Sequence, residues 1–373
     1  MGKCRKGFAG FVVVLVTAVF ILSIAAGYYS SAFWHGGTGA PTGAAPGVFE
    51  PAAPEVTISL VGDVLLAAGV GKHIASHGPD YPWEEVRPIL AASDLVLGNL
   101  ECAVATSGEP MENKQYTFRA DPASLDGAAR AGVDIFTLAN NHVLDFGYQA
   151  MLETIEQLDR RGIKHTGAGS SREAAARPVI VEKNGVVVGV LAYTMIFPEG
   201  WWVAGPANPG IASGHDINGM VADVSSLREQ VDFLVVSIHW GLELADYPRP
   251  REKALAHKLV DAGADLVFGH HPHVIQGLEY YKDGLIAYSA GNFIFTTSRD
   301  TRARQGMILQ VRAGREGLLE AAAVPTLVDA GRALALQGEE RDQVLRRLEN
   351  ISAPFGTSIG PEGQVVHSSS SNR

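Results

Sequence analysis

The chain of 373 residues contains only two cysteines, Cys4 and Cys102. Cys4 precedes an apolar N-terminal run and Cys102 lies in a core-like segment, so a disulfide between them is not expected. Two isolated thiols also exclude a disulfide framework and a zinc–thiolate site. Because Cys4 comes before the apolar run, it cannot be the cysteine of a lipoprotein.

Positive charge is also scarce. The chain has 30 Lys and Arg against 40 Asp and Glu, a formal net charge of −10, and no long basic run. Binding to a phosphate backbone needs clustered Lys and Arg, so no nucleic-acid partner is expected. An acidic protein that handles phosphate needs positive charge from another source, and bound metal is one such source.

The N-terminus, residues 1–30, is predicted to be a targeting element. Three basic residues precede residues 8–27, which carry no charge and are almost wholly apolar. About 20 apolar residues in a helix span ~30 Å, the thickness of the bilayer core. A cleaved signal peptide usually has a shorter apolar region, so we favour an uncleaved signal anchor, with a cleaved signal or a buried helix as alternatives. The basic flank predicts that everything after Tyr28 lies outside the cytoplasm.

The rest of the chain divides into three parts. Residues 31–55 are rich in Gly, Ala and Pro and are predicted to be a linker. Residues 56–335 alternate apolar runs with amphipathic stretches, which predicts an α/β domain with a largely parallel sheet and helices packed outside it. Residues 336–373 are predicted to be a C-terminal helix and a polar tail, with disorder from about Pro354.

Seven apolar runs in the main domain are predicted to be buried strands. They are VTISLVG, DLVLGN, DIFTLAN, VVVGVLAY, FLVVSIHW, DLVFGHH and LIAYSAGNFIF. Helices are predicted over residues 149–161 and 251–262. Each is followed by a glycine, Gly162 or Gly263, as helix ends commonly are.

Polar residues follow five of these strands. They are Asp63, Asn99 with Glu101, Asn140 to His142, His239, and His271 with His273. In open α/β sheets, ligands bind beyond the carboxyl ends of the strands. A donor set of carboxylate, carboxamide and imidazole suits Mn, Zn or Fe rather than a thiolate-bound metal. Any one of these residues could be structural, but five groups at five strand ends favour a site for one or two divalent metal ions.

The strongest single motif is GHHPH, residues 269–273. In an extended turn, residues two apart point the same way, so His271 and His273 are predicted to face a metal while His270 points elsewhere. The structural alternative is a loop of solvent-exposed histidines. His239 ends an apolar strand and is either a neutral ligand or a packed core histidine.

A second motif is ANNHVLD, residues 139–145. An Asn side-chain carbonyl is a neutral oxygen ligand, and the adjacent His142 is a candidate general acid. Asp145 either caps the following helix or accepts a proton from His142 and fixes its tautomer. In the structural alternative, Asn140 and Asn141 only make a turn before the helix.

The motifs GDVLL, GNLECAV, LANNHVLDFG, SIHWGLE, AHKLVDAGADLVFGHHPHVIQ and YSAGNFIF occur in this order between about residues 57 and 297. Together they resemble the CapA (PgsA) family of capsule or poly-γ-glutamate synthesis proteins. The resemblance implies a metallophosphatase-like αββα sandwich with a metal site along one edge of the paired sheets. It implies the following roles: Asp63, Asn141, His239, His271 and His273 as metal ligands, and His142 as the catalytic histidine, with Asp145 beside it.

The chain departs from the metallophosphatase pattern at two positions. Leu65 stands where the Asp-x-His motif has its histidine, and Asn99 holds the position of the metal-bridging Asp. An uncharged Asn bridges two cations poorly, so Glu101 is expected to be the bridging or compensating carboxylate. These changes leave one of the two metal positions short of a ligand.

The apolar run and its basic flank predict a single-pass protein of the bacterial cell membrane with its catalytic domain outside the cytoplasm, or a secreted protein if the signal is cleaved. We expect a role in capsule biosynthesis or export, with hydrolysis or transfer of phosphoesters at the metal site. The alternative is a degenerate, non-catalytic component that binds metal or polymer.

Expected partners are a capsular polymer or a phosphorylated small molecule, the membrane, and other capsule-synthesis membrane proteins. Asn140, Glu243 and Asn292 are candidate substrate contacts, although Asn292 could equally make only a turn.

Overall fold

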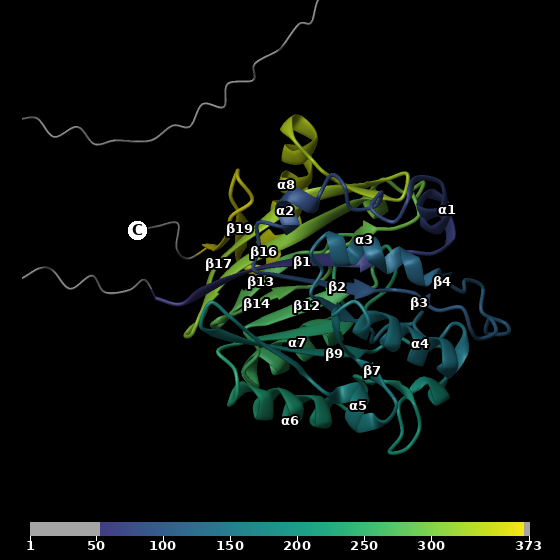
Figure 1. Ribbon diagram of the computed structural model, residues 1–373. Coiled ribbons are helices and arrows are strands. Elements are labelled where there is room, and N and C mark those ends of the chain that lie inside the picture. The colour runs from purple at the N-terminus through teal and green to yellow at the C-terminus, as the bar shows by residue number, and fades with distance from the viewer. Residues whose placement is uncertain (1–52, 369–373) are drawn as a thin grey trace, which may run out of the picture. The chain divides into compact units, whose positions relative to one another are not determined.

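The computed structural model describes residues 53–368 (Figure 1). The predicted signal anchor and most of the predicted linker lie outside these residues. Among the residues that are described, no helix combines the length and apolar character needed to cross a membrane.

Two β-sheets form the centre of the described chain (Figure 1). The first runs in the order β18 (Arg332–Ala335), β17 (Gly317–Asp329), β16 (Gln305–Gly314), β1 (Glu55–Val64), β2 (Leu95–Leu100), β5 (Ile135–Thr137), β6 (Lys164–Thr166), with β15 (Asn292–Ile294) paired to the end of β1. The second runs in the order β13 (Leu278–Tyr281), β14 (Gly284–Ala287), β12 (Leu266–His270), β11 (Phe233–His239), β9 (Val186–Thr194), β8 (Val179–Lys183).

Helices and short strand pairs complete the described chain. The helices are α1 (Ala68–His77), α2 (Arg87–Leu90), α3 (Leu125–Arg130), α4 (Gly147–Asp159), α5 (Arg172–Ala176), α6 (Ile217–Arg228), α7 (Pro250–Asp261) and α8 (Gly338–Ser352). The short pairs are β3 (Ala103–Val104) with β4 (Arg119–Ala120), β7 (Ala168–Gly169) with β10 (Gly210–Ile211), and β19 (Thr357–Ile359) with β20 (Val365–His367). The two helices predicted before Gly162 and Gly263 are confirmed as α4 and α7.

Each sheet is parallel only in part. Strands β1, β2, β5 and β6 pair in parallel in the first sheet, as do β9, β11, β12 and β14 in the second. Strands β16, β17, β18, β8 and β13 pair antiparallel. The prediction of a largely parallel sheet is therefore wrong for these five strands. Strand–helix alternation generates parallel strands only, whereas these additions come from hairpins and meanders.

The buried apolar residues form three main clusters that define four layers. Leu60 of β1 and Val235 of β11 belong to a cluster between the two sheets. Val61 of β1 faces the other way, into a cluster shared with α1, α3 and α4, and Val236 of β11 faces a cluster shared with α6 and α7. Because successive residues of a strand point to opposite faces, one apolar run can serve two layers. In Figure 1, α6 lies beyond β9 at the bottom of the view.

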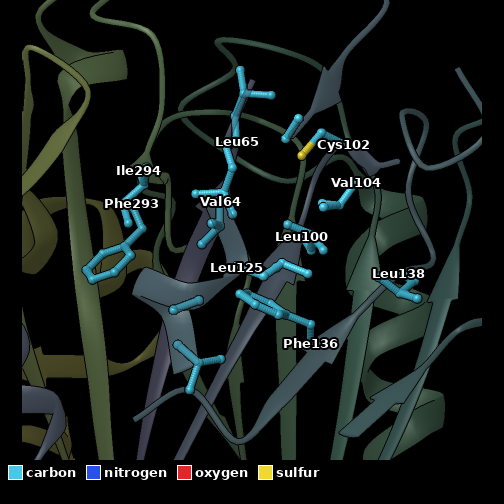
Figure 2. Packing of buried hydrophobic residues seen from close by; sticks show 14 of the residues in the cluster. Val64, Leu65, Leu100, Cys102, Val104, Leu125, Phe136, Leu138, Phe293 and Ile294 are labelled. Atoms are coloured by element: carbon cyan, nitrogen blue, oxygen red, sulfur yellow. The ribbon is translucent and has the colours of Figure 1, made fainter. Parts of the chain in front are cut away.

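Figure 2 shows the cluster on the outer face of the first sheet. Leu100 and Phe136 from neighbouring strands pack there with Leu125 of α3. Cys102 lies in the same cluster as a free, fully buried thiol. Burial raises its pKa to about 12, so the thiol stays protonated and packs as a small apolar side chain.

The apolar run at residues 285–295 is not one strand, as predicted, but two strands in different sheets. Its first part is β14 of the second sheet and its last part is β15 of the first. The chain crosses between the sheets at Gly291, whose φ is 71°. Both parts are equally apolar because both are buried, so the run alone does not reveal the crossing. The crossing brings Asn292 beside Asp63.

The predicted disorder from Pro354 is wrong as far as residue 368. The hairpin of β19 and β20 lies beside β13, the edge strand of the second sheet. The N–H groups of Leu278 and Tyr280 donate to the hydroxyls of Ser352 (3.0 Å) and Thr357 (2.9 Å). The polar C-terminal residues therefore complete a sheet edge, a role that their composition does not indicate.

Replacing Thr357 with Val should lower the free energy of unfolding by about 1–3 kcal/mol, because it leaves the Tyr280 N–H unpaired beside a buried side chain. Chemical denaturation of the full chain measures this change. Ser358→Ala, which removes an exposed hydroxyl from the same strand, is the control and should change little. Equal stability of Thr357→Val and the parent chain would mean that the hairpin does not protect the sheet edge.

Candidate metal centre

Strand register places the first acidic residue of the site. Asp63 at the end of β1 is opposite Asn99 of β2 on one side and Asn292 of β15 on the other. A Cβ on the preceding residue, Gly62, would lie 2.0 Å from the carbonyl oxygen of Gly291. Only glycine allows β15 to pass this close. The Asp63 carboxylate can therefore lie between the carboxamides of Asn99 and Asn292.

The second sheet delivers the histidines. His239 of β11 pairs with His270 of β12, and the chain then turns through His271 (φ 95°) and His273 (φ 59°). The prediction that His270 points elsewhere is wrong, because its Nδ1 lies 3.1 Å from Asp63 Oδ1. The rule that residues two apart share a face holds for extended chain, and the positive φ angles interrupt it.

Asp63 is buried but well satisfied. Asn99 Nδ2 donates to its Oδ1 (2.9 Å), and His273 Nδ1 lies 3.2 Å from its Oδ2. Burial by itself raises the pKa of Asp63, but the hydrogen bonds and charges of His270 and His273 outweigh it and hold the pKa well below its usual range. The residue is therefore an ionised carboxylate.

Glu101 is buried without such partners. Neither of its carboxylate oxygens has a hydrogen-bond partner among the described residues. Its nearest imidazole nitrogens are His239 Nε2 at 3.7 Å and His273 Nε2 at 3.8 Å. Burial and the charge of Asp63 raise its pKa well above the usual range. An ionised Glu101 would need a cation beside it, because an unpaired buried carboxylate is strongly disfavoured.

The imidazoles respond to the same surroundings in opposite ways. Burial and the neighbouring His273 lower the pKa of His271 to about 3, and burial and His271 lower that of His239 well below its usual range. Burial also lowers the pKa of His273, but Glu101 and Asp63 outweigh it and raise the pKa to about 9. Neutral His239 and His271 suit metal ligation, and the charge that holds a proton on His273 would equally attract a cation.

The structure brings the predicted ligands together. Ligand atoms of Asp63, Glu101 and His273 lie within 4.8 Å of one another, and so do those of Glu101, His239 and His271. The buried His271 Nδ1 has no hydrogen-bond partner among the described residues, like the Glu101 oxygens. Converging donors that do not satisfy one another fit a divalent cation.

Asn141 lies among the candidate metal ligands. Asn140 and Asn292, which were predicted to contact substrate, instead form hydrogen bonds that hold other site residues in position. Asn141 Oδ1 lies 2.8 Å from His239 Nε2. Asn140 is buried, donates to Asn99 Oδ1 (3.0 Å) and Leu100 O, and accepts from the N–H groups of residues 142 and 143. Asn292 is buried with its Oδ1 3.0 Å from His273 Nδ1. The structure therefore does not support Asn140 or Asn292 as substrate contacts.

His142 and Asp145 form a pair, with His142 Nδ1 2.7 Å from Asp145 Oδ2. Helix α4 begins at Gly147 and Asp145 does not cap it, so pairing with His142 is the role that the geometry favours. Burial lowers the pKa of His142, although Asp145 opposes the shift. The imidazole is therefore neutral near pH 7.

Lys114 is a site residue that the sequence analysis missed. Its Nζ contacts Asp145 Oδ1 and the carbonyl oxygen of Asn141, lies 3.1 Å from His142 Nδ1, and sits 5.1 Å from the ring centroid of Trp202. Lys114 lies in a polar loop with no ligand spacing. The one available signal for Lys114 is that a buried Asp145 carboxylate needs a second polar or charged partner besides His142.

Comparison with known proteins places the chain in a family. Residues 57–297 match the family described as "Bacterial capsule synthesis protein PGA_cap". The chain belongs to this family. The resemblance drawn from the motifs is thereby confirmed.

Curated relatives carry matching descriptions. The chain is 32% identical over 285 residues to a capsule biosynthesis protein CapA of Bacillus anthracis, covering 74% of this chain and 68% of the relative. It is 31% identical over 264 residues to a PGA biosynthesis protein CapA of Bacillus subtilis (70% and 69%). It is 33% identical over 226 residues to a probable polyglutamine synthesis accessory protein of Mycobacterium tuberculosis (57% and 59%).

Solved structures show a more distant likeness. A phosphatase of Mycoplasma pneumoniae is similar with a TM-score of 0.46 and 14% identity, covering 74% of this chain and 95% of that one. The NAD nucleotidase of Haemophilus influenzae is similar with a TM-score of 0.43 and 14% identity (80% and 63%).

Replacing Glu101 with Gln should remove most of the stabilisation that a bound cation provides, because the buried carboxylate is the group left without a partner. For the parent chain, Mn²⁺ at about 100 times its Kd should add ~2.7 kcal/mol to the free energy of unfolding relative to the chelated protein. Denaturation with and without Mn²⁺ measures the difference. Glu340→Gln, an exposed site on α8, should respond like the parent chain. A full Mn²⁺ response in Glu101→Gln would exclude Glu101 as a ligand.

Proposed function

We propose that this protein is a cell-envelope component of capsule or poly-γ-glutamate synthesis whose metal centre hydrolyses or transfers phosphoesters. Membership of the PGA_cap family and the descriptions of the curated relatives support the capsule role. The N-terminal apolar run supports a membrane anchor that leaves the domain outside the cytoplasm.

The observation that carries the catalytic proposal is the buried, unpartnered Glu101 carboxylate among converging ligands of two sheets. A divalent metal bound there would supply positive charge for an anionic oxygen and would lower the pKa of a bound water. Asp63, Glu101 and His273 would hold one ion; Glu101, Asn141, His239 and His271 would hold the other. Two divalent ions would outweigh the negative charges of Asp63 and Glu101. The remaining positive charge favours an anionic substrate such as a phosphoester.

His142 is placed to move a proton beside these ligands. Asp145 engages its Nδ1, and its Nε2 makes no hydrogen bond with the described residues, which leaves Nε2 for the substrate. Burial keeps the free imidazole neutral, with Nδ1–H donating to Asp145. The negative charge of a bound phosphoryl group would raise the pKa again, so that Nε2 can carry the proton that a leaving oxygen needs.

Replacing His142 with Ala should lower phosphodiesterase turnover by about 10²–10⁴-fold while the protein keeps its metal, because the residue moves a proton and does not ligate. Hydrolysis of bis-p-nitrophenyl phosphate with Mn²⁺ and elemental analysis of the same sample measure both quantities. His257→Ala, at an imidazole that pairs with Glu279 away from the site, is the matched control and should keep its turnover. Unchanged turnover in His142→Ala would remove this residue from catalysis.

A second candidate function is non-catalytic binding of the capsular polymer. Its support is a set of exposed large side chains on loops that also carry site residues: Tyr116, Trp201, Leu242, Leu244 and Tyr247. Tyr116 lies two residues after Lys114, Trp201 precedes the Trp202 that Lys114 covers, and Leu242 and Leu244 flank Glu243. Exposed apolar groups around a polar centre are typical of a binding surface.

Replacing Trp201 with Ala should weaken binding of poly-γ-glutamate to the purified full chain by about tenfold, equivalent to ~1.4 kcal/mol, without changing its metal content. Fluorescence anisotropy with a labelled polymer measures the affinity. Ile180→Ala, at an exposed apolar residue of edge strand β8, should bind like the parent chain. Equal affinities for all three proteins would argue against polymer binding at this surface.

A further inference from the structure

We infer that Glu243 is a metal ligand, and that it completes the metal position left incomplete by Leu65. This inference rests on the proposed metal centre and adds a residue to it. It gives Glu243 a different role from the substrate contact expected from the sequence.

Leu65 has no side-chain atom that can bind a metal, and its side chain belongs to the apolar core. It is fully buried in the cluster on the outer face of the first sheet, together with Val64 and Leu100 (Figure 2). The missing ligand must therefore come from another part of the chain.

The loop after β11 is held over the histidine turn. A Cβ on Gly241 would lie 3.2 Å from Pro272 Cγ, so the loop packs directly against this proline. The N–H of Leu244 donates to Pro272 O (2.8 Å), and Gln276 Nε2 donates to Ala245 O (2.8 Å). These contacts lie on both sides of Glu243 and set its distance from His271 and His273.

The Glu243 carboxylate approaches the histidines without pairing with them. One ligand atom from each of Glu243, His271 and His273 lies within 4.8 Å of the others. Glu243 is exposed and makes no hydrogen bond or ion pair with the residues that the structure describes. His271 is buried, and its Nδ1 is one of the unpartnered nitrogens of the site. An unpartnered, buried nitrogen on a histidine of this group is the second sign, beside the acidic cluster, that a cation belongs here.

Charge supports the same assignment. Asn99 puts a neutral carboxamide at a position where the metallophosphatase pattern has a carboxylate. Glu243 restores the lost negative charge from the opposite sheet. The Glu243 group shares His273 with the Asp63–Glu101 group and His271 with the Glu101–His239 group. We assign Glu243 to the first position because that position has three proposed ligands, whereas the second already has four. With Asp63, Glu101 and Glu243 as the carboxylates, two divalent ions would keep positive charge for an anionic substrate.

The test is metal stoichiometry of the full chain, purified in detergent, stripped with chelator and titrated with Mn²⁺ in equilibrium dialysis with elemental analysis. The parent chain should bind two ions. Glu243→Gln should keep one and lose the other, or bind it at least about tenfold more weakly. Glu199→Gln removes an acidic side chain from another exposed loop and should match the parent chain. Electron paramagnetic resonance should show Mn–Mn coupling in the parent chain and its loss in Glu243→Gln.

The outcomes separate this inference from the proposed function. Identical stoichiometry and affinity in Glu243→Gln and the parent chain would overturn the role of Glu243 but leave the metal centre intact. A parent chain that binds no Mn²⁺ would overturn the proposed function itself. Circular dichroism of each variant shows that the protein is folded, so a loss of metal is not a loss of fold.

Discussion

Two carboxylates, Asp63 and Glu101, are buried where the two sheets meet, and the remaining polar residues of the site are arranged around their charge. Asp63 is neutralised within the protein by Asn99, His270 and His273. Glu101 is not. Burying a charge without a partner is costly, so Glu101 is either protonated, as its raised pKa indicates, or ionised beside a bound cation. The buried, unpartnered Glu101 thus supports a bound cation more directly than any single sequence motif does.

The site divides into two functional parts. Carboxylates and imidazoles from the ends of β1, β2, β11 and β12 form the part that would hold metal. The other part consists of His142 and Asp145, on the loop after β5, and Lys114, on the loop between β3 and β4. Burial lowers the pKa of His142, and the charge of Lys114 adds to the shift, although Asp145 opposes it. In the proposed function, His142 would move a proton beside the residues that would hold the metal.

The apolar runs predicted the central strands, such as β2 and β11, since these strands are buried on both faces. They did not predict sheet membership. Strands β14 and β15 come from one continuous apolar run, yet they lie in different sheets because the chain turns at Gly291. The C-terminal hairpin was missed for the opposite reason, since it satisfies the edge of β13 through a hydroxyl, that of Thr357, rather than through an apolar face.

The sequence by itself determined which residues stand at the ends of strands, and hence that Asp63, Glu101, His239 and His273 would meet. This follows from the chain's local pattern, because apolar runs end where the polar residues begin. Tertiary structure alone decided which groups His270, Lys114 and Glu243 lie beside. His270 is 207 residues from Asp63, and its orientation depends on positive φ angles in the turn that follows it. Such contacts depend on loop conformation and on how two sheets face each other, and neither leaves a periodic signal in the sequence.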